Sequence, residues 1–160
     1  LSPLQAALYA AAIANEGTVF QPYVVQKVVS TDGRIRRETA PRSRSNLPVE
    51  PEHLRIVKEG MRRVVNGNHA TAHRARNNAI SVAGKTGTAE VKSGGEDYKN
   101  AWFIGYAPVE DPRYALAVLV EHGESGGRTA APIAGAFFEQ WLTAGNRVSQ
   151  QARAATLTRE

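Results

Sequence analysis

Apolar residues recur at helical spacing in three segments, which predict helices over about residues 3–15, 51–66 and 131–142. The first opens with Ser2-Pro3-Leu4-Gln5, where a serine N-cap, a first-turn proline and a glutamine at the third position favour a helix start. Its predicted core face consists of Leu4, Ala7, Leu8 and Ala11. Small residues surround that face, so we expect this helix to be buried on both sides within a larger body.

The other two predicted helices differ in how much of their surface is apolar. The second presents one line of residues, namely Leu54, Val57, Met61 and Val64. The third presents two adjacent lines, namely Ile133, Phe137 and Trp141, and Ala134, Phe138 and Leu142. Because so wide a stripe must be covered, we expect the third helix to lie against a sheet.

Three segments have the composition of β-strands: residues 80–91, 101–107 and 114–121. The segments between them, 92–100 and 108–113, are polar and short enough for antiparallel hairpins. Nearer the amino terminus, residues 18–29 favour extended structure, whereas residues 34–48 are rich in Arg and Ser and predict an exposed loop. The sequence therefore predicts an α+β fold, an antiparallel sheet with helices packed on it.

The composition is that of one ordinary globular domain. The 160 residues are 42% hydrophobic and 22% charged, and no apolar run reaches the ~20 residues that a membrane-spanning helix needs. The absence of cysteine excludes disulfides, thiolate metal sites and cysteine nucleophiles. Because the chain begins with Leu1 rather than Met, we expect a piece of a longer protein, with a domain portion over residues 1–145 and a polar, flexible tail over 146–160.

Basic charge is concentrated in one stretch, between Arg34 and Arg76, where eleven basic residues against four acidic ones give +7, compared with +5 for the whole chain. The stretch contains no Phe, Tyr or Trp, so it favours a solvated basic face over a nucleic-acid interface. His69 and His73 in the same stretch have the spacing of a helical metal pair. No HExxH glutamate accompanies them and a loop is predicted there, which favours two solvent-exposed histidines.

A short segment, Gly84-Lys85-Thr86-Gly87-Thr88, is best suited to bind a ligand. The two glycines would let a ligand approach the backbone closely, Lys85 would attract a carboxylate, and the two threonine hydroxyls would add hydrogen bonds. A glycine-rich edge strand with a solvated lysine has the same pattern. The segment alone therefore does not decide between a binding groove and an ordinary edge strand.

Several groups of residues in a fixed order connect this segment to a family. They are Ser2-Pro3-Leu4-Gln5 with Ala11-Ala12-Ile13-Ala14-Asn15, Gly60-Met61 with Val64-Val65, residues 83–89, residues 101–108, and Glu121-His122-Gly123 with Ala131-Pro132. On these residues the chain resembles the C-terminal half of a class B penicillin-binding protein transpeptidase domain, and within that class most resembles penicillin-binding protein 2. One departure is Ala70-Thr71-Ala72, where many relatives have Gly-Thr-Ala; it weakens the turn predicted there.

The resemblance implies roles for the Lys-Thr-Gly segment. Lys85 would face the groove and hydrogen-bond a serine of the second family motif, while Thr86 and Thr88 would bind the carboxylate of a substrate peptide or a β-lactam. The backbone N–H of Thr88 would form half of an oxyanion hole. Catalysis would thus involve Lys85 and Thr88, and substrate binding would involve Lys85, Thr86, Gly87 and Thr88. The resemblance implies no metal and no cofactor.

Two family motifs are missing from the chain. No serine is followed by Lys three positions later, and no Ser-x-Asn occurs, so the nucleophile and the second motif would lie upstream. Tyr98-Lys99-Asn100 looks like a variant of the second motif, but it follows Lys-Thr-Gly in a predicted loop. We therefore expect the chain to be inactive by itself, and to self-associate through helix faces separated from the upstream half of the domain.

For the complete protein, the resemblance implies a D,D-transpeptidase that cross-links peptidoglycan stem peptides through an acyl-serine and is acylated by β-lactams. It further implies a location on the outer face of the cytoplasmic membrane, an anchoring N-terminal helix outside this chain, and a membrane glycan polymerase as partner. The alternative is a non-catalytic module that binds cell-wall peptide or a partner protein. The sequence that separates the two hypotheses lies outside the chain.

The segment Gly123-Glu124-Ser125-Gly126-Gly127 suggests two other chemistries. It matches the nucleophile elbow of α/β-hydrolases, but no Asp or His follows Ser125, which favours a glycine-rich loop between the last strand and the last helix. A phosphate-binding loop is disfavoured too, because His122 and Arg128 replace its essential glycine and lysine.

Overall fold

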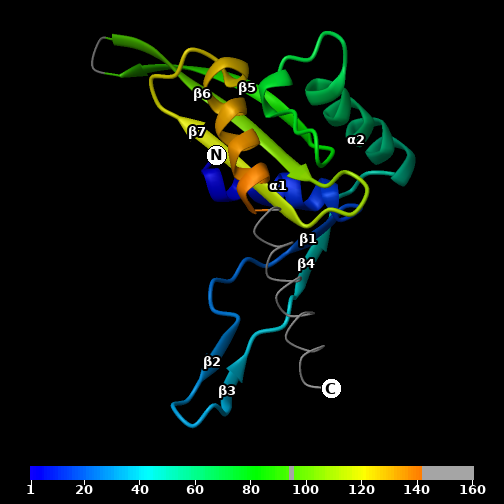
Figure 1. The fold of residues 1–160 in the computed structure, drawn as a ribbon, viewed down its shortest axis with the longest axis vertical. Coiled ribbons are helices and arrows are strands. Elements are labelled where there is room, and N and C mark those ends of the chain that lie inside the picture. Colours follow the sequence, from blue (N-terminus) through cyan, green and yellow to red (C-terminus); the bar gives the residue numbers. More distant parts are fainter. Residues whose placement is uncertain (94–95, 142–160) are drawn as a thin grey trace.

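The computed structural model describes residues 1–93 and 96–141, and its centre is a three-stranded antiparallel sheet (Figure 1). The strands are, in spatial order, β5 (Ala83–Ser93), β6 (Glu96–Ala107) and β7 (Tyr114–Val120). Each of the three overlaps a segment that the sequence predicts as a strand, and β6 begins five residues before the predicted segment 101–107. β5 is an outer strand of this sheet, and this position matters for the site below.

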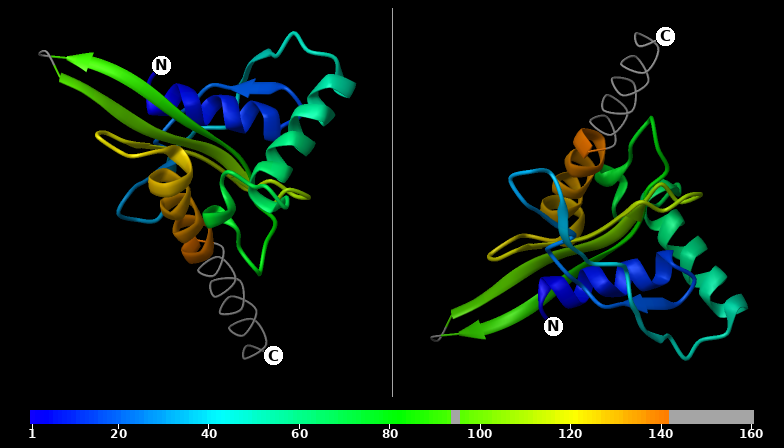
Figure 2. Two further views of the ribbon diagram at one scale, coloured as in Figure 1. Left: turned by 90° about the horizontal axis from the view of Figure 1, so that it is seen from above. Right: turned by 90° about the horizontal axis from the view of Figure 1, so that it is seen from below.

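Helices cover both faces of the sheet (Figure 2). α1 (Pro3–Ala14) packs against β6 and β7 on one face, residues 131–141 form a helix on the other, and α2 (Pro51–Asn66) packs against β5. The predicted α+β class is confirmed. No helix in the described part of the chain is both long and apolar enough to cross a bilayer.

α1 begins as predicted but turns a different face inward. The Ser2 hydroxyl accepts a hydrogen bond from the Gln5 N–H, and the Gln5 side chain accepts one from the Ser2 N–H at 2.8 Å, which completes a capping box. Leu4 is 59% exposed, and the buried residues are Ala6, Ala10, Ala12 and Ala14. Because the helix is apolar on almost every side, periodicity does not determine its buried face. Leu4 and Tyr9 are exposed in this chain, and burial of the helix on both sides within a larger body stays a prediction.

Of the two apolar lines on the last helix, one is fully buried and the other only in part. Ala134 and Phe138 are fully buried against the sheet, whereas Ile133 and Trp141 are about half exposed, at 49% and 53%. Leu142 and the predicted tail lie outside the described residues. The second line still contacts this side of the molecule, because Phe137 packs against the core and the Trp141 ring lies 6.1 Å from the Tyr114 ring of β7.

β5 and β6 continue through the predicted polar connection, residues 92–100, as far as positions 93 and 96. The register places Glu90 opposite Lys99 and Lys92 opposite Asp97, with ammonium-to-carboxylate distances of 4.0 and 3.7 Å. The predicted loop was wrong because a hairpin that is solvated on both faces is polar at every position. It therefore lacks the alternation that reveals a half-buried strand.

A β arm extends from the body between α1 and α2 (Figure 1). It consists of two separate antiparallel pairs: β1 (Thr18–Phe20) with β4 (Ser43–Asn46), and β2 (Lys27–Val29) with β3 (Ile35–Glu38). Residues 34–48 are exposed, as expected, but they contain β3 and β4 rather than only loop. The reason is the turn at Asp32-Gly33, where Gly33 has a φ of +80° and the chain returns alongside β2.

Ser81 connects the start of β5 to the turn between β6 and β7. Its hydroxyl donates a hydrogen bond to the Glu110 carboxylate and accepts one from the Val109 N–H at 3.2 Å. The bond from Ser81, followed by one from the backbone of Glu110 itself, lowers the pKa of the Glu110 carboxyl below its usual value of 4.5. The ionised carboxylate thus helps to hold this turn against the strand.

We predict that Ser81→Ala raises the pKa of Glu110 toward 4.5, measured by NMR titration of the side-chain carboxyl. Because the native pKa is lowered, Glu110 stabilises the fold above about pH 4.5, and this contribution is lost as the pH falls through the native pKa. The variant should lose that part of the pH dependence. Ser30→Ala, which removes the corresponding bond to Asp32, is the matched control and should leave Glu110 unchanged. An unaltered Glu110 titration in Ser81→Ala would contradict the assignment.

Candidate functional site

The Lys-Thr-Gly segment lies on β5, and no strand of the described residues pairs with the outer edge of β5. The register places Lys85 opposite Ile104 and Thr86 opposite Phe103. Because side chains alternate along a strand, Lys85 shares the α1 face of the sheet with Gly87, whereas Thr86 turns toward the face covered by the last helix. Thr88 is two positions after Thr86, so the hydroxyls of both threonines lie on one face of the strand and the ammonium group of Lys85 on the other.

Lys85 lies in a cavity of about 480 Å³ between the start of α1 and β5. The residues lining it are Leu1, Ala6, Tyr9, Lys85, Thr86, Gly87, Ala89, Trp102 and Ile104. The Lys85 side chain is exposed, and its Nζ donates to the Thr86 carbonyl oxygen at 2.6 Å. Among the residues described, no carboxylate lies within 4.0 Å of this ammonium group, so its charge is available to an anionic ligand.

Thr71 is a site residue that sequence reasoning missed. It lies in the turn between α2 and the short helix η1 (His73–Ala75), and its Oγ1 is 3.2 Å from the Oγ1 of Thr86. The sequence marked Ala70-Thr71-Ala72 only as a departure in a turn. The two threonines are fifteen positions apart in the sequence, and no periodicity connects a turn to a strand at that distance.

Two glycines bring this turn and β5 together. They belong to η2 (Gly126–Ala130), a single π-helical turn that precedes the last helix. A Cβ on Gly126 would lie 2.8 Å from the Gly87 nitrogen, and one on Gly127 would lie 2.2 Å from the Thr71 carbonyl oxygen. Only residues without a side chain fit between these two backbone segments.

Gly84 has an internal role rather than the expected role of admitting a ligand. A Cβ on Gly84 would lie 2.2 Å from the Cζ of Phe103, and one on Gly105 would lie 2.7 Å from the same ring. The Phe103 ring is fully buried across these two paired glycines. Of the two glycines that the sequence assigned to ligand access, only Gly87 lines the cavity beside Lys85.

Tyr106 lies beneath the same strand on the α1 face, packed with Ala83 and Met61. Its side chain is fully buried, and burial, with a smaller effect of the Glu16 charge, raises the pKa of Tyr106 to about 12. The phenol is therefore neutral at physiological pH. It supports the strand from below and does not supply a base.

The other sequence candidates lie outside this arrangement. Ser125 caps η2, because its hydroxyl accepts a hydrogen bond from the Arg128 N–H at 3.4 Å. The sheet beside it is antiparallel, whereas the sheet of an α/β-hydrolase is mainly parallel. His73 Nδ1 lies 3.3 Å from the Ala70 carbonyl oxygen. In the described ranges, no three His, Asp or Glu side chains gather as a metal site would require. Tyr98-Lys99-Asn100 lies within β6 rather than in a loop.

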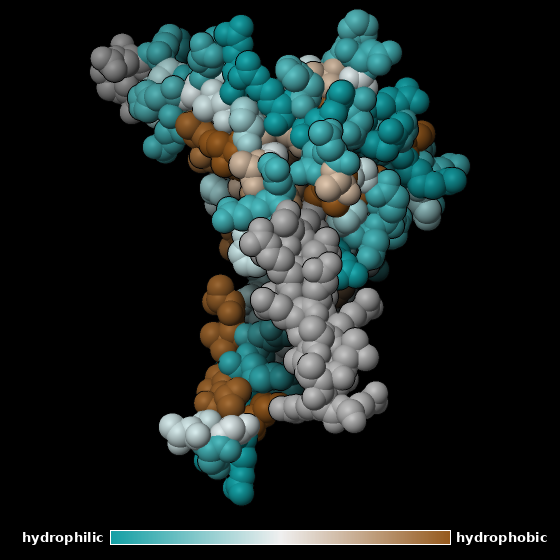
Figure 3. All heavy atoms as spheres, in the orientation of Figure 1, coloured by the Kyte–Doolittle hydropathy of each residue, from teal (hydrophilic) through white to brown (hydrophobic). Residues whose placement is uncertain are grey.

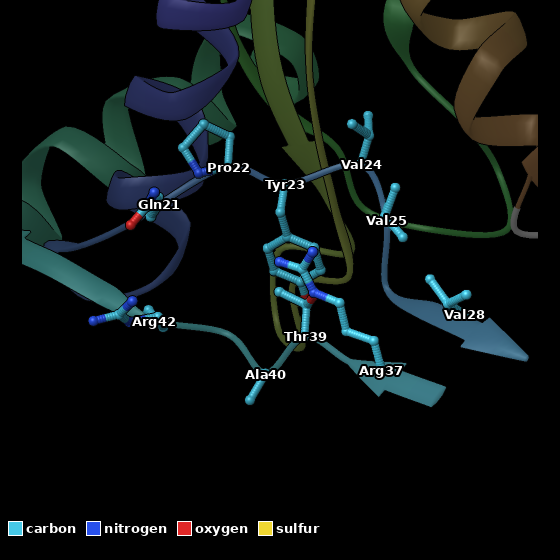
Figure 4. A pocket seen from close by; sticks show the side chains of 10 residues that line it. All are labelled: Gln21, Pro22, Tyr23, Val24, Val25, Val28, Arg37, Thr39, Ala40 and Arg42. Atoms are coloured by element: carbon cyan, nitrogen blue, oxygen red, sulfur yellow. The ribbon is translucent and has the colours of Figure 1, made fainter. Parts of the chain in front are cut away.

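A larger cavity, of about 580 Å³, lies in the arm, where exposed apolar residues gather (Figures 3 and 4). It is lined by Gln21, Pro22, Tyr23, Val24, Val25, Val28, Arg37, Thr39, Ala40 and Arg42. Figure 4 shows the Arg37 side chain extending toward the Tyr23 ring. Since its lining includes no carboxylate, histidine or serine, this cavity is less suited to chemistry than the one at Lys85.

The penicillin-binding protein transpeptidase domain family matches residues 1–139, most of the chain. The chain belongs to this family. Peptidoglycan D,D-transpeptidase PbpA of Mycolicibacterium smegmatis is 37% identical over 142 residues, which cover 83% of this chain and 28% of that protein. Peptidoglycan D,D-transpeptidase MrdA of Acinetobacter baumannii is 33% identical over 153 residues, 88% of this chain and 22% of the relative.

Solved transpeptidase structures share the fold. Penicillin-binding protein A from Mycobacterium tuberculosis, in a ceftriaxone acyl-enzyme complex, has a TM-score of 0.76 and 33% identity, over 87% of this chain and 32% of that one. Penicillin-binding protein 2B from Streptococcus pneumoniae strain R6 has a TM-score of 0.78 and 25% sequence identity. The match covers 89% of this chain and 25% of that chain. The family predicted from the sequence is confirmed, and the chain spans less than a third of the length of these relatives.

We predict that Gly84→Ala destabilises this transpeptidase segment by about 2–3 kcal/mol, because the new methyl group must displace the buried Phe103 ring. Gly60→Ala, within α2 and with nothing within 4 Å of the added Cβ, is the matched control and should stabilise by up to about 1 kcal/mol. Urea denaturation of both variants measures the difference. Equal stability of the two would show that Phe103 does not require a glycine at position 84.

Proposed function

We propose that this chain forms one wall of the active-site groove of a peptidoglycan D,D-transpeptidase, and that residues upstream of it supply the other wall. The observation that carries the proposal is the Lys-Thr-Gly segment on an outer strand, with the Lys85 ammonium group in a cavity and without a carboxylate partner among the residues described. Membership of the transpeptidase family supports it. The unpaired outer edge of β5 is the side from which a substrate peptide would approach.

The proposed reaction proceeds through an acyl-serine intermediate. A serine hydroxyl from the upstream half attacks the carbonyl of the penultimate D-alanine, the peptide bond to the last D-alanine breaks, and free D-alanine leaves with the proton on its amine. An amine of a neighbouring stem peptide then attacks the ester, forms the cross-link and regenerates the serine. A β-lactam reacts in the same way: the serine hydroxyl attacks the lactam carbonyl, which opens the ring and leaves a penicilloyl-serine.

This chain's own residues bind and polarise the substrate. Thr86 and Thr88 donate hydrogen bonds to the terminal carboxylate. Lys85, on the opposite face of the same strand, attracts that carboxylate by its charge across the outer edge of the strand and hydrogen-bonds the serine of the second motif. The Thr88 N–H is one of two donors to the developing oxyanion, each worth ~3 kcal/mol of barrier. Gly87 keeps the backbone open to the peptide.

The same proposal places the complete protein on the outer face of the cytoplasmic membrane, anchored by a helix outside this chain. A membrane glycan polymerase would supply the strands to be cross-linked. Stem peptides and β-lactams are the proposed ligands, the upstream half of the domain is the structural partner, and no nucleic acid is involved. The M. tuberculosis relative, captured as an acyl-enzyme with ceftriaxone, supports the assignment of β-lactams.

We predict that Lys85→Ala in the complete transpeptidase lowers the rate of acylation by a fluorescent penicillin by about 100-fold or more, because the carboxylate loses its positive partner. Lys92→Ala is the matched control, since Lys92 is an exposed lysine on the same strand, 3.7 Å from Asp97, and away from the cavity. Its acylation rate should stay within twofold of wild type. A Lys85→Ala enzyme that is acylated at the normal rate would remove Lys85 from the site.

We further predict that the 160-residue chain by itself forms no covalent adduct with a fluorescent penicillin, because it contains no Ser-x-x-Lys. Intact-mass spectrometry after incubation measures this directly. A mass increase equal to one penicillin would place the nucleophile within this chain and overturn the proposed division of the site. If the complete protein binds stem peptide but is never acylated, the non-catalytic module is favoured instead.

A further inference from the structure

The hydroxyl groups of Thr71 and Thr86 form a pair at the outer strand of the sheet. Their oxygens are 3.2 Å apart, Thr71 is exposed and Thr86 is half-buried. Each threonine hydroxyl has one hydrogen to donate and can also accept. In the pair, therefore, one hydroxyl donates to the other, and the acceptor keeps its own hydrogen for a third group.

The position of Thr71 is set by its backbone rather than by chance contact of a surface side chain. The next residue, Ala72, is fully buried, and its N–H donates to the Val64 carbonyl oxygen of α2 at 2.9 Å. Gly127 of η2 lies directly against the Thr71 carbonyl oxygen. Arg74 adds a hydrogen bond of 3.3 Å from its guanidinium group to the carbonyl oxygen of Arg128. The turn is thus held from both sides.

η2 holds this turn and β5 together. Gly126 lies against the backbone of Gly87, while its neighbour Gly127 lies against Thr71, so two consecutive residues contact both segments. The separation of Thr71 from Thr86 therefore depends on packed backbone, which varies little. A hydroxyl held in this way can orient its partner without costly ordering of a flexible side chain.

We propose that Thr71 is a positioning residue for carboxylate recognition, a role that rests on the proposed function. An ionised carboxylate only accepts hydrogen bonds. When it binds Thr86, the Thr86 hydrogen points to the ligand, and the Thr71 hydroxyl donates to the Thr86 oxygen from behind. This second bond polarises the Thr86 hydroxyl and fixes its rotamer, which strengthens the bond to the anion.

The test uses the complete transpeptidase with Thr71→Val, which keeps the shape and removes the hydroxyl, and Thr71→Ser, which keeps the hydroxyl. Acylation by benzylpenicillin is compared with acylation by its methyl ester, in which the carboxylate charge is removed. We expect Thr71→Val to lower the second-order acylation rate of the acid about fivefold, or about 1 kcal/mol. The loss should fall on the dissociation constant of the initial complex rather than on the rate of the chemical step.

Two comparisons make the result specific. For the methyl ester, Thr71→Val and wild type should agree within twofold, and Thr71→Ser should retain the wild-type rate for the acid. The acid-to-ester ratio is taken within one variant, so a partly misfolded preparation cancels from it. Thr18→Val in β1, far along the chain from the site, is the matched control and should leave the ratio unchanged.

Each outcome bears on a different claim. An equal loss for acid and ester, no loss for either, or a loss in Thr71→Ser as large as in Thr71→Val would overturn the role of Thr71 and leave the proposed function intact. A wild-type enzyme that benzylpenicillin does not acylate, or a Lys85→Ala enzyme that it acylates normally, would overturn the proposed function and the role of Thr71 with it.

Discussion

The fully buried ring of Phe103 is the contact on which the arrangement of the site depends. It lies across Gly84 and Gly105, which face each other on β5 and β6, and no other residue type fits beneath it. A slip of one residue between these strands would bring a side chain under the ring. It would also move Lys85 to the opposite face, because side chains alternate. The register, and with it the face that carries the ammonium group, is therefore determined by packing in the core.

A second layer of backbone contacts connects elements that are distant in sequence. Gly126 and Gly127 allow one π-helical turn to contact both the Lys-Thr-Gly strand and the turn that contains Thr71. In the sequence these glycines look like part of a nucleophile elbow or a phosphate loop. In the structure they serve as thin spacers between two backbone segments. A glycine-rich stretch beside an active-site strand thus contributes through what it lets approach, without binding a ligand itself.

The sequence predicts helices and strands well where one face is apolar and where capping or turn residues indicate the ends. The capping box at Ser2, the end of α2 near Asn66 and the three strands of the sheet all follow from such signals. Prediction from the sequence fails in two places. In α1, apolar residues lie on almost every side, so the pattern does not show which face is buried; in the solvated half of the β5–β6 hairpin, apolar and polar residues do not alternate. The pairing of Thr71 with Thr86 arises only from tertiary packing, so local patterns contain no trace of it.

The β5–β6 hairpin is governed by different forces along its length. Its inner half is held by buried apolar contacts, whereas its outer half is held by backbone pairing and by exposed ion pairs such as Lys92 with Asp97. Ionic strength weakens exposed ion pairs and leaves the packed core almost unaffected. Salt therefore loosens the projecting end of the hairpin while the Lys-Thr-Gly segment, a few residues away on the same strand, keeps its place.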